Sequence, residues 1–178
     1  MIDGIEQIVI RHPTQADLLA LEWNGTYTHF RRLYQDIYDS SLRGEAILWV
    51  LELSEAGVIG QLFVQLISSR KELADGSQRA YIYAFRIQLD YRGHGLGGRL
   101  LSAVEDDLYR RDFRIAVLNV ARDNEAARLF YHRRGYQVVA NEPGQWSYLD
   151  NLGRRCWVDE PAWRMEKMLY DDGRIKDI

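Results

Sequence analysis

The pattern of hydrophobic and polar positions predicts strands and helices that follow one another along the whole chain. Runs rich in β-branched and aromatic residues indicate strands, and apolar residues three and four positions apart indicate helices. Strands are predicted at residues 5–11, 46–53, 58–67, 80–89, 115–120, 136–140 and 163–169. Helices are predicted at residues 14–21, 28–42, from the glycines near residue 95 to about residue 111, and 124–133. This order indicates one continuous α/β unit.

Turn signals bound several of these elements. The first strand ends at His12-Pro13, because the residue before a proline is pushed away from helical angles. Thr14 followed by Asp17 resembles a capping box that starts the first helix. Gly44 and Gly135 are the expected ends of two later helices. Two hairpins are predicted, one around residues 54–57 and one around residues 150–153 within the long aromatic segment 141–161.

Length and composition narrow the class of protein. A chain of 178 residues with 47% hydrophobic content can bury one substantial core, so a single domain is expected. No apolar run reaches the roughly 18 residues of a membrane span, and the N-terminus lacks the pattern of a signal peptide. We therefore expect a soluble, cytoplasmic protein without a membrane partner. The single cysteine, Cys156, excludes an internal disulfide.

Charge and histidine spacing exclude further classes. The formal net charge of -3 argues against a nucleic-acid partner. Only the middle of the chain, residues 86–134, carries more basic than acidic side chains, which favours an anionic ligand there. The four histidines show no metal-ligand spacing, so no metal is expected.

The strongest chemical signal is the glycine-rich run from Arg92 to Gly98. It follows a predicted strand and opens a predicted helix, so backbone N–H groups and the helix dipole would converge on an anion. A simple tight turn would also explain these glycines. Gly93, Gly95 and Gly98 also fit the G-x-G-x-x-G dinucleotide fingerprint, but the acidic residue expected about 20 residues later is missing. The polar turn before the glycines and the short remaining chain also disfavour that interpretation.

Two segments together resemble the GNAT superfamily of acyltransferases. Arg92-Gly93-His94-Gly95-Leu96-Gly97 resembles its R/Q-x-x-G-x-G/A signature, although Leu89 stands where a proline is common. The second segment carries five residues at the spacing of the family's downstream motif, with Phe130 in place of the usual leucine: Asn124, Ala127, Tyr131, Gly135 and Tyr136. The two motifs span residues 80–136 and stand in the family's order.

This resemblance implies a fold, a cosubstrate and binding residues. It implies a GNAT acetyltransferase domain over residues 1–170, with a central mixed, mostly antiparallel sheet flanked by helices, and a polar tail over residues 171–178. It also implies acetyl-CoA as cosubstrate, with pantetheine on the backbone near Phe85 and Ile87. Carried over by position, the coenzyme A site comprises Phe85, Arg86, Ile87, Arg92, Gly93, His94, Gly95, Leu96, Gly97, Gly98, Asn124 and Tyr131.

The implied activity is transfer of an acetyl group to a primary amine by direct attack, with Tyr131 as general acid. The acceptor is a small molecule, a peptide N-terminus or a protein lysine, and the sequence does not choose among them. A phenol near pKa 10 facing a thiol near 8.5 makes complete proton transfer unfavourable by roughly 2 kcal/mol, so partial transfer is expected. Packing alone would also explain Tyr131, and a helix N-cap alone would explain Asn124.

The general base is the gap in this prediction. Several GNAT enzymes place a glutamate on one of two strands, but here those strands carry Tyr81, Tyr83 and Asn119. A water chain held by Tyr83 and Asn119 is one hypothesis, which makes these two residues catalytic candidates. The missing carboxylate also leaves a non-catalytic acyl-CoA-binding domain as the alternative function.

The acceptor pocket can be predicted only by its place in the fold. In GNAT folds it is built from the first helical segment and the loop between the last strands, which predicts an aromatic wall from six residues: Trp23, Tyr27, His29, Trp146, Tyr148 and Trp157. Glu22 and Asp150 are candidates for recognising a cationic amine. Many relatives dimerise, so a homodimer is left open, as is the preferred acyl chain.

Overall fold

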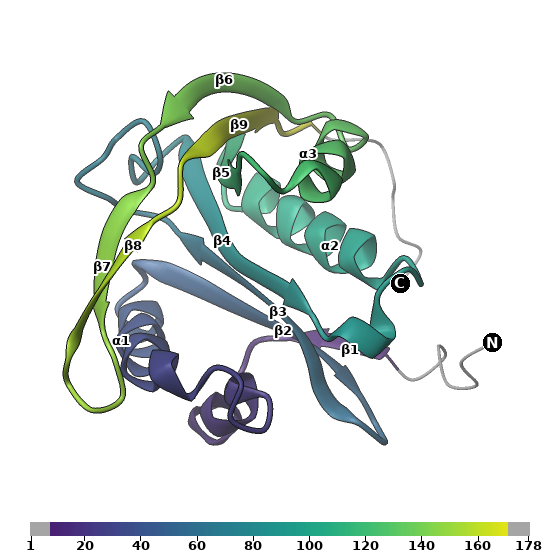
Figure 1. Cartoon of the computed structure of the whole chain (residues 1–178). Helices are drawn as coiled ribbons and strands as arrows, with labels where there is room; N and C mark the ends of the chain where they lie inside the picture. The colour runs from purple at the N-terminus through teal and green to yellow at the C-terminus, as the bar shows by residue number, and fades with distance from the viewer. Residues whose placement is uncertain (1–7, 171–178) are drawn as a thin grey trace.

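A seven-stranded sheet forms the centre of the computed structural model, which describes residues 8–170 (Figure 1). Its strands run in the order β1 (Ile8–Arg11), β2 (Ala46–Leu53), β3 (Gly57–Gln65), β4 (Arg79–Ile87), β5 (Ile115–Ala121), β9 (Ala162–Met168) and β6 (Gln137–Glu142). The β4–β5 pair is parallel, and every other neighbouring pair is antiparallel. The prediction of a mixed, mostly antiparallel sheet is confirmed.

Helices cover both faces of this sheet. The 3₁₀ helices η2 (Gln15–Glu22) and η3 (Thr28–Phe30) and the helix α1 (Arg31–Leu42) lie on one face. The helices α2 (Leu96–Arg110) and α3 (Glu125–His132) lie on the other, after the short 3₁₀ helix η4 (Leu89–Tyr91). Within the described range, no helix has the length and apolar content of a membrane span.

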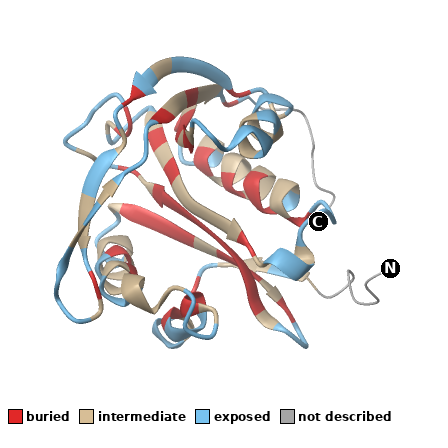
Figure 2. Cartoon of the chain, viewed as in Figure 1, coloured by how far each residue is buried: buried red, intermediate tan, exposed pale blue. Residues whose placement is uncertain are grey.

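Each face has its own hydrophobic core, and Figure 2 shows the buried positions concentrated on the middle strands and on the sheet-facing side of α2. Leu100, Leu101, Val104 and Leu108 of α2 are fully buried against the sheet, as their helical spacing predicts. On the opposite face, Tyr34 and Ile37 of α1 pack on strands β2 and β3. The separation into two cores follows from a sheet whose middle strands bury both faces.

The predicted element boundaries are close to the observed ones. Thr14 donates its N–H and its hydroxyl to the Asp17 carboxylate, at 2.6 and 2.8 Å, at the start of η2. The helix predicted from residue 28 begins as η3 and becomes α-helical at Arg31. Both predicted hairpins form, β2–β3 and a separate β7 (Gln145–Leu149) with β8 (Arg155–Asp159). Residues 5–7 of the predicted first strand and the predicted tail 171–178 lie outside the described residues.

The feature that creates a site is the separation of β4 from β5. The two strands pair only over Arg79–Ile82 and Ile115–Leu118. Just beyond, Ala84 adopts a left-handed backbone (φ 49°) and the register with β3 shifts, while the fully buried Gln61 donates to the Ala84 carbonyl at 3.2 Å. From Tyr83 to Ile87, therefore, β4 has no pairing with β5 on one side.

The irregularity at Ala84 also changes the face to which β4 presents its side chains. Before it, Ile82 faces the α2 core while Tyr81 and Tyr83 face α1. After it, Phe85 and Ile87 both lie on the α2 side, and Arg86 lies on the α1 side. Without the extra residue, strict alternation would place Phe85 on the α1 side and Arg86 on the α2 side.

Candidate active site

The glycine-rich turn leaves the end of β4 and opens α2. Gly93 and Gly95 have φ of 80° and 78°, a left-handed backbone that favours glycine, and open space surrounds the position of a Cβ at each. Gly95 is the N-cap residue, and no side chain caps the first turn of α2. The uncapped N–H groups from Leu96 onward therefore suit an anion.

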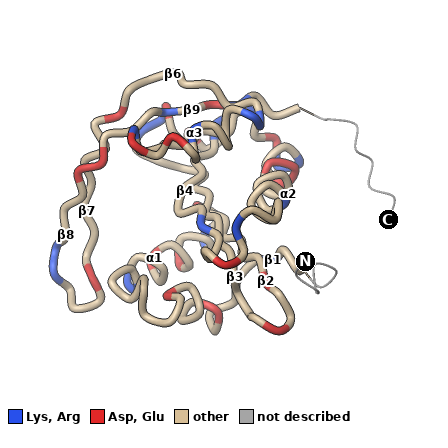
Figure 3. The backbone as a smooth tube through the Cα atoms, turned by 45° about the vertical axis from the view of Figure 1, so that its right-hand side comes forward, with Lys and Arg blue, Asp and Glu red and all other residues tan. Residues whose placement is uncertain are grey.

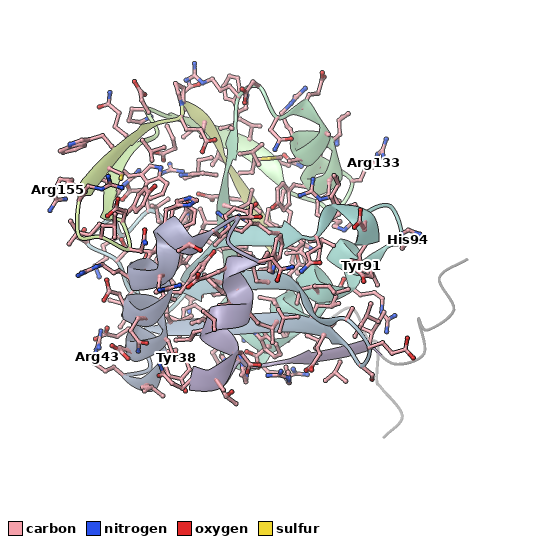
Figure 4. The ribbon with its side chains drawn as sticks, turned by 60° about the horizontal axis from the view of Figure 1, so that its bottom comes forward. Tyr38, Arg43, Tyr91, His94, Arg133 and Arg155 are labelled. Atoms are coloured by element: carbon pink, nitrogen blue, oxygen red, sulfur yellow. The ribbon has the colours of Figure 1, made fainter. Side chains whose placement is uncertain are left out.

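Contacts around this turn fix its position. Arg92 donates Nε to the Ile87 carbonyl at 2.8 Å, which ties the turn to the end of β4. His94 is exposed, and Figure 4 shows it on the same side of the molecule as Tyr91 and Arg133. Gly97 packs close to Phe85, since a Cβ there would lie 3.4 Å from the Phe85 Cζ.

Arg134 is a basic residue at this site that the sequence analysis did not single out. Its guanidinium lies against Gly98, stacks 3.7 Å from the Phe130 ring centroid and donates to the Phe130 carbonyl at 3.2 Å. Basic positions appear near the start of α2 and just beyond α3 in Figure 3. The positive balance of residues 86–134 was the available signal, but it could not show which side chain reaches the helix start.

The second predicted motif forms α3. Asn124 is its N-cap, and its Oδ1 accepts a hydrogen bond from the Ala127 N–H at 3.1 Å. Tyr131 lies on the sheet-facing side among aromatic rings, with centroids 6.3 Å from Phe85 and 5.6 Å from Tyr136. Burial raises the pKa of the Tyr131 phenol, as does the nearby Tyr81, and Arg134 partly opposes the rise. The phenol is therefore neutral at physiological pH and can donate a hydrogen bond.

On the α1 side of the sheet lies a cavity of about 720 Å³. Its walls come from α1, the strands β3, β4 and β5, and the segment that joins β6 to β7. Tyr81, Tyr83, Asn119, Glu142 and Trp146 line it. This cavity and the glycine-rich turn lie on either side of the point at which β4 leaves β5.

The two tyrosines of β4 stack in this cavity, with ring centroids 5.7 Å apart and planes 7° from parallel. Burial raises the pKa of Tyr81 to about 12, with a further contribution from the negative charge of Glu142. Burial also raises the pKa of Tyr83, and Tyr81 adds to the rise. Both phenols are therefore neutral hydrogen-bonding groups.

Asn119 lies beside Tyr81. A hydrogen bond from its side chain lowers the pKa of the Tyr81 phenol, against the larger effect of burial. The Asn119 Oδ1 is buried and has no hydrogen-bond partner within residues 8–170. The sequence hypothesis paired Asn119 with Tyr83; both line the cavity, and Tyr81 is the phenol with which Asn119 interacts.

Glu142 is a buried carboxylate in the cavity wall that sequence reasoning missed. It is 3% exposed and accepts two hydrogen bonds from Arg70 at 2.9 Å and one from Arg164 at 3.3 Å. Two guanidinium groups therefore pair with its charge. Arg70 and Glu142 stand 72 positions apart, so no local pattern indicates their pairing.

Neither acidic candidate for amine recognition lines the cavity, and both are engaged in local hydrogen bonds. Glu22 accepts hydrogen bonds from Arg31 and Thr28, which join η2 to α1. Asp150 accepts from the Leu152 and Arg154 N–H groups and from the Arg154 side chain, and so shapes the β7–β8 turn. Their carboxylates stabilise local structure.

The predicted aromatic wall is only partly correct. Trp146 lines the cavity, and Tyr148 packs 4.9 Å from Phe30 beside it. Trp157 is 77% exposed and does not line the cavity. The other rings that line it come from η3, α1 and the strands β3 and β4: Phe30, Tyr34, Phe63, Tyr81 and Tyr83.

Within residues 8–170, no group of three or more His, Cys, Asp and Glu side chains is arranged to hold a metal ion.

Residues 15–136 match the model of the acetyltransferase (GNAT) family. The chain belongs to this family. It is 31% identical over 90 residues to YycN of Bacillus subtilis (strain 168), named as an uncharacterized N-acetyltransferase, a match that covers 51% of this chain and 54% of YycN. It is also 31% identical over 86 residues to N-alpha-acetyltransferase 30 of Schizosaccharomyces pombe, covering 48% of this chain and 57% of that protein. The chain thus spans a little over half the length of these relatives.

Solved GNAT structures share the fold. The crystal structure of Arabidopsis thaliana NAA60 in complex with acetyl-CoA matches with a TM-score of 0.69 at 18% identity, over 91% of this chain and 98% of that chain. The sheet order of this GNAT member, with one parallel pair, also differs from a doubly wound sheet. The G-x-G-x-x-G pattern therefore does not mark a dinucleotide site here.

Proposed function

We propose that the protein is an acetyl-CoA-dependent N-acetyltransferase that acts on a primary amine. The observation that supports this most directly is the separation of β4 from β5 beside an uncapped helix start. The unpaired edge of residues 83–87 can bind the pantetheine arm as an added strand, through N–H and C=O groups near Phe85 and Ile87. The pyrophosphate would then lie on the N–H groups of the glycine-rich turn and the first turn of α2.

In this arrangement the thioester lies at the split, between Tyr131 and the cavity that holds the acceptor. The amine nitrogen attacks the thioester carbonyl, the C–N bond forms, and the C–S bond breaks as the coenzyme A thiolate leaves. Tyr131 donates a hydrogen bond to that thiolate. Because the pKa of Tyr131 is raised, the phenol stabilises the thiolate without giving up its proton completely.

The acceptor must lose a proton, since a lysine-like amine is mostly protonated at neutral pH. Glu142 is paired with arginines, and the cavity phenols are neutral. We propose that water molecules carry the proton to solvent, held by Tyr83 and Asn119 with Tyr81 as a third partner. The buried and unpaired Asn119 Oδ1 supports this route, because such an oxygen needs a hydrogen-bond donor.

Replacement of Tyr131 tests the proposed activity. We expect Tyr131→Phe to lower kcat by about 10²- to 10⁴-fold while KM for acetyl-CoA stays nearly constant, as typical acid–base contributions predict. Release of the free coenzyme A thiol is measured across small amines, N-terminal peptides and lysine peptides. Tyr38→Phe, a half-buried tyrosine of α1 that does not line the cavity, serves as the matched control (Figure 4).

Two outcomes would contradict this proposal in different ways. An unchanged kcat in Tyr131→Phe would remove the assignment of the general acid. Tight binding of acetyl-CoA without turnover on any acceptor would instead favour a non-catalytic acyl-CoA-binding domain.

A further inference from the structure

Arg86 places a guanidinium without an acidic partner in the wall of the acceptor cavity. Its side chain is half-buried and donates one hydrogen bond, from Nη1 to the Tyr34 hydroxyl at 3.2 Å. No carboxylate within residues 8–170 forms an ion pair with it, whereas Arg70 in the same wall is paired with Glu72 and Glu142. Arginine has five N–H donors, so most of those on Arg86 are left for a ligand.

Aromatic rings hold this guanidinium in place. It lies 4.3 Å from the Tyr27 ring centroid and 5.2 Å from that of Phe30. Stacking limits the conformations of the side chain, so little entropy is lost when it binds a ligand. A fixed planar guanidinium with free N–H groups has the geometry that binds a carboxylate with two parallel hydrogen bonds.

The far end of the cavity carries both carboxylates and arginines. Tyr81 lies there, where the charge of Glu142 is paired with Arg70 and Arg164. Glu160 also lines the cavity, and no arginine or lysine within residues 8–170 forms an ion pair with it. On β3, Tyr81 pairs with Gln65 and Arg86 pairs with Gln61, so their Cα atoms are separated by about 13 Å along the strand. The cavity therefore offers the Arg86 guanidinium at one end and, at the other, the Glu160 carboxylate beside the hydrogen-bonding oxygens of Tyr81 and Asn119, which suit an amine.

We propose that the acceptor is a primary amine that also carries a carboxylate, which Arg86 binds while the amine lies near Tyr81 and Asn119. This inference rests on the proposed function, because it assigns the acceptor of the same site. The spacing along β4 favours acceptors in which several bonds separate the amine from the carboxylate over α-amino acids. Such a carboxylate belongs either to a small amino acid or to an acidic side chain near a peptide N-terminus.

Matched acceptors that differ only in charge test this inference. The small-molecule arm uses β-alanine, γ-aminobutyrate and 6-aminohexanoate, each beside its own carboxamide. The peptide arm uses a tetrapeptide with Glu in the second position beside its Gln counterpart. For each pair, kcat/KM is measured in the wild type, Arg86→Gln, Arg86→Lys and the control Arg32→Gln, which removes an exposed arginine outside this cavity.

We expect the wild type to prefer the carboxylate member of at least one pair by about 10- to 100-fold, the range of a hydrogen-bonded charge pair. Arg86→Gln should abolish that ratio, Arg86→Lys should restore part of it, and Arg32→Gln should retain it. A ratio is used because a general loss of activity cancels from it. The arm that shows the preference identifies the source of the carboxylate.

A binding measurement separates this inference from the proposed function. Each small-molecule pair is titrated by calorimetry into the protein saturated with coenzyme A, whether or not turnover is seen. If the carboxylate member of a pair binds more tightly than its carboxamide, and Arg86→Gln abolishes this preference, the inference is supported even if no acceptor turns over. Equal binding of both members, or a preference that survives Arg86→Gln, would overturn it while leaving the acetyltransferase proposal intact.

Discussion

Three half-buried tyrosines surround the split between β4 and β5, and the protonation of their phenols decides what each can do. Burial raises the pKa of Tyr81, Tyr83 and Tyr131, with Tyr81 at about 12. A general acid stops working as pH rises through its pKa, so a raised pKa moves that loss to higher pH. None of these residues is therefore a phenolate base near neutrality.

The pH dependence of kcat follows from this. We expect kcat to rise between pH 6 and 10 as the acceptor amine loses its proton, without a descending limb, because Tyr131 keeps its proton throughout. Steady-state assays with one acceptor over this range check the prediction. A fall in kcat below pH 10 in the wild type that is absent from Tyr131→Phe would contradict it.

At the start of α2, two neighbouring arginines allow a matched comparison. Arg134 lies against Gly98, whereas Arg133 is exposed. We expect Arg134→Ala to raise the Kd of acetyl-CoA by about fivefold, the value of one partly exposed charge interaction with a phosphate, and Arg133→Ala to change it by less than about twofold. Calorimetric titration measures both, and equal effects would show that only the general basic charge matters.

Among the elements, the sequence predicted the helices, because the residues that form a helix lie close together along the chain. Apolar spacing predicted α1 and α2, and the motif spacing around Asn124 predicted α3 with its cap. Nothing in the sequence predicted the left-handed Ala84, since alanine carries no signal for that backbone. The sequence analysis assigned Arg86 to the coenzyme A site by position, and no sequence pattern indicated that its side chain lines the cavity on the α1 side.

Gly144 lies in the short connection between β6 and the β7–β8 hairpin, and Gly57 is a matched control for its replacement by alanine. Both have a left-handed backbone, with φ of 70° and 72°. A Cβ at Gly57 would meet open space, whereas one at Gly144 would collide with the Glu160 carbonyl. We expect Gly57→Ala to lower the free energy of unfolding by about 1 kcal/mol and Gly144→Ala by at least about 2 kcal/mol more.

Urea denaturation of both variants measures this difference. Because Gly144 and Glu160 line the acceptor cavity, Gly144→Ala should also raise KM for the acceptor. Equal destabilisation of the two variants would show that the contact with Glu160 relaxes without cost.

For the molecule as a whole, the two family motifs could be predicted because each is contiguous in sequence. The cavity could not, because it joins residues from α1, β4, β5 and the β6–β7 connection. β9 lies between β5 and β6, so the Arg164–Glu142 contact also depends on a strand order that no local pattern encodes. Long-range pairing determines the proposed acceptor site, and short-range pattern determines the proposed cosubstrate site.

Amide hydrogen exchange tests whether the cosubstrate completes the sheet. We expect acetyl-CoA to slow exchange at residues 83–87 and at the first turn of α2, and to leave β2 nearly unchanged because it is already paired on both sides. Mass spectrometry of peptides from the protein with and without acetyl-CoA provides the comparison. Equal exchange of the β4 peptide in both states would contradict binding along this edge.

The partial pairing of β4 with β5 has a further consequence for the lifetime of the protein. A ligand that binds only the folded state of a protein stabilises that state. If acetyl-CoA occupies the open edge of β4, it therefore raises the free energy of unfolding by about 2.7 kcal/mol at a concentration 100 times its Kd. Resistance to unfolding and to proteolysis then rises and falls with the supply of the acyl donor. A shortage of acetyl-CoA would thus reduce the amount of folded protein as well as the rate of the proposed reaction.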